Sequence, residues 1–252
     1  MKSNEEFYRI LAQKETGGYK NPYAVVNKQG YMGKYQMGKY ALHDVGYYNV
    51  HSDKWTGKDG IKSQGDFLKN PQVQEKAIRD YMKKQWEYTS DIHDKVGEII
   101  GNEVLTPSAI LAGAHLVGQE KMREYVKSGG TGKVPTDGNG TPITEYMRKM
   151  GHCDVKSETK GTQYDSQQAE QMQEYLDRFN PTSGVPDGYY EDVVNAGMWP
   201  ELQSKVLPHL GKQSAQNAGS TSCPGSYSVS GYKTKDGKIV DGYTRECWKH
   251  SH

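Results

Sequence analysis

Apolar side chains recur at helical spacing along most of the chain, and this pattern predicts a mainly α fold. The first helix shows the pattern, because Phe7, Ile10 and Leu11 fall on one face. Two polar, glycine-rich stretches, residues 46–65 and 129–141, predict exposed loops. Further segments with helical character lie at 39–45, 71–88, 105–118 and 163–179, with shorter pieces at 190–196 and 200–207.

Start and stop signals support three of these helices. The glycines at 17–18 end the first helix, which places Glu15 in its last turn. Pro71 suits the first position of the helix that it opens, and Thr106 before Pro107 is a standard helix start. The helix that follows Thr106 contains small residues that would let a neighbouring helix approach closely, namely Ala112, Gly113 and Ala114.

The composition divides the chain into three predicted parts. Residues 1–155 hold most of the apolar segments and form the main domain. Residues 156–212 form a helical extension, and residues 213–252 form a Ser/Gly-rich linker followed by a tyrosine-rich tail. The dipeptide Asp236-Gly237 within this tail predicts a short β-hairpin.

The cysteines predict at most one disulfide. The chain has three cysteines, which is too few for a disulfide framework. Cys223 and Cys247 flank the tail and could pair, which would leave Cys153 unpaired. Because no CxxC or HxxxH spacing occurs, we expect neither a metal ion nor another cofactor.

Charge and hydropathy narrow the class of protein. The net charge of +1, without a basic stripe, argues against a nucleic-acid partner. No apolar run approaches the ~20 residues of a membrane span, and the N-terminal segment lacks a hydrophobic signal region. The chain has 19 Tyr and only 3 Phe. Tyrosine suits stacking on sugar rings, although it could equally replace phenylalanine in a polar, loop-rich protein.

Four short motifs in the main domain carry a family resemblance. Residues 15–18 read Glu-Thr-Gly-Gly, 21–24 read Asn-Pro-Tyr-Ala, and 30–37 read Gly-Tyr-Met-Gly-Lys-Tyr-Gln-Met. Residues 142–147 read Pro-Ile-Thr-Glu-Tyr-Met. In this order they resemble the soluble lytic transglycosylase branch of the lysozyme-like superfamily, with threonine in place of the usual serine after the glutamate. The resemblance covers about the first three-fifths of the chain and implies a lysozyme-like α+β catalytic lobe.

The resemblance also implies roles for single residues. Glu15 would be the catalytic acid, and Tyr146 would lie against it. His115 stands where the family has a residue that lines the cleft, so it would contact a sugar N-acetyl group unless it is a hydrogen-bonded core histidine. Asn21 would bind sugar or only shape its loop. The full set of implied substrate-binding residues is Asn21, Tyr31, Tyr35, Gln36, Met37, His115 and Tyr146.

A second carboxylate would decide how the reaction ends. No Asp or Glu lies between Glu15 and Gln36, and the next candidates are Asp44, Asp53 and Asp59. The gap fits a one-acid mechanism that ends in a 1,6-anhydro sugar, as the resemblance implies. One of the three aspartates could instead activate water and make the enzyme a hydrolytic muramidase.

Together these features predict a glycosidase that cleaves the β-1,4 bond between N-acetylmuramic acid and N-acetylglucosamine in peptidoglycan. We expect it to act in the bacterial periplasm or cell wall, as an antibacterial effector toxin or a lysis enzyme. It would be exported by a specialised route, as part of a larger protein, or by lysis. A toxin would have an immunity protein as its inhibitor. The alternatives are a non-catalytic peptidoglycan-binding module with the same fold and a chitin-type glycosidase.

Overall fold

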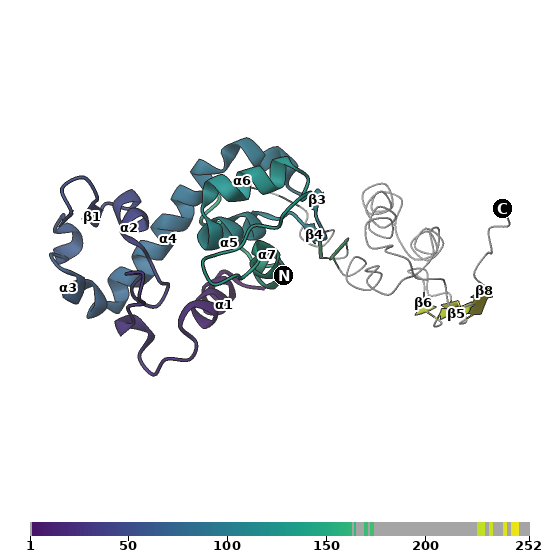
Figure 1. The fold of residues 1–252 in the computed structure, drawn as a ribbon, viewed down its shortest axis with the longest axis horizontal. Coiled ribbons are helices and arrows are strands. Elements are labelled where there is room, and N and C mark those ends of the chain that lie inside the picture. The colour runs from purple at the N-terminus through teal and green to yellow at the C-terminus, as the bar shows by residue number, and fades with distance from the viewer. Residues whose placement is uncertain are drawn as a thin grey trace. The chain divides into compact units, whose positions relative to one another are not determined.

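The computed structural model describes residues 2–162, 164, 169–170 and 172–173, together with four short strands between residues 226 and 246 (Figure 1). The chain forms two compact units, Met1–Gln167 and Gln168–His252. The predictions for the helices after residue 174, the linker, Asp236-Gly237 and the cysteines at 223 and 247 lie outside the described residues. The fold below is therefore that of the first unit, except where the tail strands are named.

The described part of the first unit is mainly α, as predicted. Its α-helices are α1 (Asn4–Thr16), α2 (Lys39–Asp44), α3 (Gln64–Leu68), α4 (Pro71–Tyr88), α5 (Pro107–Val117), α6 (Gln119–Lys127) and α7 (Ile143–Met150). Short 3-10 helices are η1 (Pro22–Ala24), η2 (Lys58–Gly60) and η3 (Ser90–Lys95). Figure 1 shows α4 running between the group of α2, α3 and β1 at one end and α1, α5, α6 and α7 at the other.

Two small antiparallel sheets complete the first unit. Strands β1 (Tyr48–Asn49) and β2 (Lys54–Trp55) pair Tyr48 with Trp55. Strands β3 (Ile99–Ile100) and β4 (Glu103–Val104) pair Ile99 with Val104. In the tail, the outer pair β5 and β8 and the inner pair β6 and β7 are also antiparallel. Their bounds are Ser226–Val229, Tyr243–Glu246, Tyr232–Lys233 and Ile239–Val240.

The predicted helix ends are confirmed. Gly17 is the C-cap of α1. Pro71 occupies the first turn of α4, behind an Asn70 cap that accepts from the Val73 amide. Thr106 caps α5 through its side chain. The loop prediction for residues 46–65 is wrong in part, because the segment contains the β1–β2 pair and buries side chains such as Tyr47, Tyr48 and Ile61.

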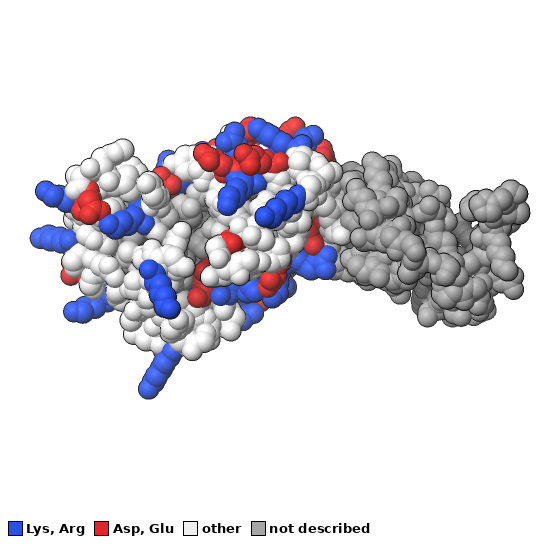
Figure 2. All heavy atoms as spheres, in the orientation of Figure 1, with Lys and Arg blue, Asp and Glu red and all other residues white. Residues whose placement is uncertain are grey.

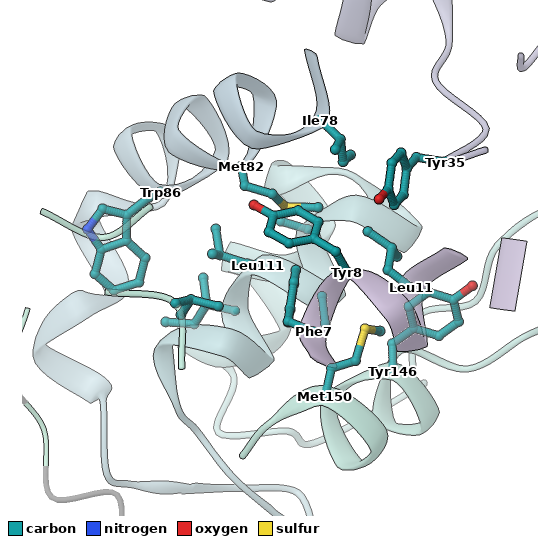
Figure 3. Packing of buried hydrophobic residues seen from close by; sticks show 14 of the residues in the cluster. Phe7, Tyr8, Leu11, Tyr35, Ile78, Met82, Trp86, Leu111, Tyr146 and Met150 are labelled. Carbon is teal, nitrogen blue, oxygen red and sulfur yellow. The ribbon is translucent and has the colours of Figure 1, made fainter. Parts of the chain in front are cut away.

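Helix α5 is the centre of the core, and α4, α6 and α7 pack against it. A Cβ atom at Gly113 would lie 2.5 Å from the sulfur of Met122 and 3.0 Å from Ile143, so glycine permits the close approach of α6 and α7. Figure 3 shows Phe7 and Leu11 of α1 in this core, with Leu111 of α5. The face of the molecule in Figure 2 carries Lys and Arg interspersed with Asp and Glu, in keeping with the small net charge.

Residues on both sides of the predicted boundary at 155 contact the first residues of the chain. Lys2 forms a parallel bridge with Cys153, and the Asp154 amide donates to the Lys2 carbonyl. The buried Glu158 carboxylate accepts a hydrogen bond of 2.9 Å from the Tyr8 hydroxyl on α1. The start of α1 is therefore fastened to the segment that follows α7.

Candidate active site

Glu15 lies in the last turn of α1, where the helix meets the glycine-rich loop. Its neighbour Thr16 is buried, and the Thr16 hydroxyl donates to the Lys34 carbonyl at 2.8 Å. This bond ties the loop to the end of the helix. Threonine can make this bond because its hydroxyl is a hydrogen-bond donor, as that of serine would be.

Two side chains from distant helices meet one oxygen of Glu15. The Tyr146 hydroxyl of α7 donates to Glu15 Oε1 at 2.9 Å. His115 Nε2 of α5 lies 3.4 Å from the same oxygen. The Glu15 side chain is 18% exposed and that of His115 is 7% exposed. The structure thus brings together three of the predicted site residues.

Tyr146 is held as a neutral donor. Burial raises the pKa of its hydroxyl, and the nearby Glu15 carboxylate raises it further. Lys14 and Glu145 form an ion pair beside it, and Lys14 Nζ lies 5.7 Å from the centre of the Tyr146 ring. Lys149 also pairs with Glu145, at 3.0 Å. The charges next to Glu15 are therefore already paired with one another.

Tyr81 on α4 extends the site away from Glu15. Its ring meets the His115 ring edge to face, with 6.3 Å between the ring centres. Burial raises the pKa of the Tyr81 hydroxyl, and the charges of Asp44, Tyr88 and Tyr31 raise it further. Tyr81 is not among the predicted site residues, because its position within the predicted helix 71–88 gives no sign of a place in the site.

Two predicted sugar contacts belong to the core instead. Tyr35 is 1% exposed, and its hydroxyl donates to Glu75 at 2.6 Å. Met37 is 2% exposed. A sugar ring cannot stack on a side chain that the core already covers, so both residues support the loop. Lys34 pairs with the same Glu75 at 2.6 Å, which fastens the loop to α4.

The other loop residues remain accessible to different degrees. Tyr31 is 47% exposed, and its ring lies over Gly38, where a Cβ atom would come within 2.9 Å of it. Asn21 is exposed at the start of η1 and makes no side-chain capping bond. Gln36 has a positive φ of 46° and donates to the Gly33 carbonyl at 2.9 Å. Within the described part of the chain, none of the three hydrogen-bonds to Glu15.

The three candidate second carboxylates differ in their partners. Asp53 pairs with Lys39 at 2.6 Å, and Asp59 pairs with Lys76 at 2.8 Å. These hydrogen bonds lower the pKa of both aspartates. Burial raises the pKa of Asp44, against a smaller opposing effect of the Tyr88 hydroxyl. Of the three, Asp44 is the one whose charge helps to raise the pKa of Tyr81, which contacts His115.

The part of the chain that the structure describes can also be searched for metal-binding clusters and membrane-spanning helices. No three His, Cys, Asp or Glu side chains cluster there in a way that would hold a metal ion. Every helix in that part is too short or too polar to cross a membrane.

Comparison with protein-family models, curated proteins and solved structures gives no match for this chain. The site therefore has to be interpreted from its own geometry. That geometry is one partly buried carboxyl with two neighbours at a single oxygen, a tyrosine that donates a hydrogen bond at 2.9 Å and a histidine nitrogen 3.4 Å away.

Proposed function

We propose that the chain is a peptidoglycan glycosidase of the lysozyme-like type, with Glu15 as its general acid. One observation carries the proposal: His115 and Tyr146, which are 100 or more residues from Glu15 in the sequence, both contact Oε1 of its carboxyl. An ordinary surface glutamate at a helix end would have no such neighbours. The resemblance of residues 15–37 and 142–147 to lytic transglycosylases adds the substrate class.

Cleavage of a glycosidic bond begins when an acid protonates the leaving oxygen. The acid must reach the substrate with one oxygen while the protein orients the other. Oε2 of Glu15 has no hydrogen-bond partner among the described residues, and the side chain keeps 18% of its surface exposed. Oε2 would thus be the oxygen that faces the bond between N-acetylmuramic acid and N-acetylglucosamine.

The exposed residues of the loop would bind the glycan strand. Tyr31 offers an open ring face for stacking, and Asn21 offers an amide that no cap occupies. Gln36 would bind sugar only if it left its bond to Gly33. Tyr35 and Met37 would hold this loop in place from below.

Asp44 is the best second carboxylate of the three candidates. Asp53 and Asp59 already form ion pairs, with Lys39 of α2 and Lys76 of α4 respectively. An Asp44 that activates water would give hydrolysis, whereas a reaction without it would end in a 1,6-anhydro sugar. The released fragments therefore report which of the two reactions occurs.

The test is the loss of turbidity of purified cell walls with the parent chain and with Glu15→Gln. The variant should lose at least a hundredfold in rate, because the amide cannot donate the proton. Glu6→Gln is the matched control, since Glu6 lies on the same helix and pairs with Arg9 on the surface. Mass spectrometry of the released muropeptides then separates the hydrolytic from the anhydro product. Clearing by Glu15→Gln at the parental rate would refute the role of Glu15.

The setting follows from this activity. The enzyme would act in the periplasm or cell wall of a target bacterium, as an antibacterial effector or a lysis enzyme. A producing cell would then need an immunity protein against it. A parent chain that sediments with cell walls but does not clear them would favour the alternative, a binding module that has kept the fold.

A further inference from the structure

The two neighbours of Glu15 are not distributed evenly over its carboxyl. Tyr146 and His115 both approach Oε1, at 2.9 and 3.4 Å. Tyr146 has a single hydroxyl proton, which it donates to this oxygen. The position of the remaining proton on Glu15 therefore depends on what His115 Nε2 carries.

The surroundings of the other ring nitrogen of His115, Nδ1, indicate which nitrogen carries the proton. Nδ1 is buried and has no hydrogen-bond partner among the described residues. A buried N–H without an acceptor destabilises the fold, and buried donors without partners are rarer in proteins than buried acceptors without partners. In the neutral ring, a proton on Nδ1 is therefore unfavourable. The favoured tautomer of the neutral ring carries its proton on Nε2.

We infer that His115 is a positioning residue, a neutral imidazole that donates from Nε2 to Oε1 and thereby keeps the acidic proton of Glu15 on Oε2. This inference rests on the proposed function for its consequence, since Oε2 is the oxygen assigned to the substrate. It replaces the predicted contact between His115 and a sugar N-acetyl group. A ring that is 7% exposed leaves little surface for a sugar.

The charged group that contacts the His115 ring is the Glu15 carboxyl itself, which favours an imidazolium only when it is ionised. In the part of the chain that the structure describes, Glu15 is the one carboxylate within 4 Å of the His115 ring. From α4, the ring meets the uncharged Tyr81. The titratable groups that face Glu15 or its partners are Lys14 of α1, Tyr81 of α4, Asp137 of the preceding loop, and Glu145 and Tyr146 of α7.

The first measurement is the ¹⁵N spectrum of the full chain labelled at histidine, recorded from about pH 5 to pH 8. The chain has eight histidines, so the His115 signals are assigned by their loss in His115→Gln. We expect the neutral ring to have a protonated Nε2 and a bare Nδ1. A neutral ring that carries its proton on Nδ1 would overturn the inference.

The second measurement compares cell-wall cleavage by His115→Gln and His115→Met, after circular dichroism has shown that both are folded. The glutamine amide can donate near the position of Nε2, whereas methionine fills similar space without a donor. We expect kcat of His115→Met to fall about 10- to 100-fold with a small change in KM, because the carboxyl loses its orientation. The alkaline limb of its pH profile should move to higher pH, since one hydrogen bond to the carboxylate is lost. His115→Gln should recover most of the rate and the parental limb.

The two measurements separate this inference from the proposed function. A parent chain that cleaves no glycan refutes the function, while the spectrum still decides the state of His115. A parent chain that cleaves, with both variants equal to it in kcat and in pH profile, refutes the positioning role and leaves Glu15 as the acid.

Discussion

Replacement of Glu158 by alanine should destabilise the first unit by about 3 kcal/mol, although this residue lies far from Glu15 in the sequence. The Glu158 side chain is 1% exposed. It accepts hydrogen bonds from the Tyr8 hydroxyl at 2.9 Å, Asn4 Nδ2 at 2.8 Å and Ser157 Oγ at 2.6 Å. Arg79 lies 3.8 Å away and covers the Tyr8 ring.

The magnitude follows from the groups that the substitution leaves behind. The Tyr8 hydroxyl is buried and would lose the carboxylate that accepts its hydrogen bond, at a cost of about 1–3 kcal/mol. The Asn4 amide and the Arg79 guanidinium are partly exposed and would be rehydrated in part, which adds about 1 kcal/mol. The total resembles the ~3–5 kcal/mol lost when one partner of a buried pair is removed. In a domain of this size it lowers Tm by roughly 6–12 °C.

The assay is thermal and denaturant unfolding followed by circular dichroism, for Glu158→Ala, Tyr8→Phe and the double variant. The double-mutant cycle should show a coupling of at least about 1 kcal/mol, because each single variant breaks the same hydrogen bond. Glu98→Ala is the matched control: this residue is half exposed, and its loss should change stability by less than about 0.5 kcal/mol. A Tm for Glu158→Ala within about 2 °C of the parent would refute the reasoning.

Two further predictions concern the backbone and the pH dependence of stability. Gly130→Ala should lower the free energy of unfolding by about 3 kcal/mol, because the added Cβ would lie 2.0 Å from the Gly101 nitrogen. Gly132 is the matched control: it has a similar positive φ but open space around it, so Gly132→Ala should lower the free energy of unfolding by only about 1 kcal/mol. Burial alone would raise the pKa of Glu75, but hydrogen bonds, the largest from Lys34, lower it overall. Its stabilisation is therefore complete above the ordinary glutamate pKa and is lost as pH falls through the lowered value, so acid titration of unfolding should be shallower below about pH 4 for Glu75→Gln.

The sequence predicted the helices best where apolar spacing and cap residues agree. Helix α4 has Pro71 at its start and a buried face that includes Val73, Ala77 and Trp86, as expected. Helix α6 was missed, because it has only nine residues and follows α5 after the single residue Gly118. The φ of 87° and ψ of 153° at Gly118 redirect the chain, and the spacing of apolar residues carries no sign of such a bend.

The site was predictable only in its central pair. The motifs around Glu15 and Tyr146 predicted their proximity, and the hydrogen bond agrees with it. The misplacement of Tyr35 has a physical cause: a tyrosine in a loop has the same identity whether its ring faces water or the core. The position of the Tyr35 ring depends on Glu75, 40 residues later, which accepts a hydrogen bond from the Tyr35 hydroxyl. Such long-range pairing is invisible to local patterns.

Two sets of contacts hold helix α1, and one of them belongs to the candidate site. Glu158 bonds Tyr8 and Asn4 in the first half of the helix, and Tyr146 bonds Glu15 at its end. Helix α1 has 13 residues, and Tyr8 and Glu15 are separated by about two of its turns. The segment after α7 holds the first half of this helix through Glu158, and α7 holds its end through Tyr146. A chain that ends at residue 155 would keep every group of the site but lose the hydrogen bonds of Glu158 to α1. Its α1 would be held only at the end that carries Glu15, so the protein used in assays should extend through residue 162 or beyond.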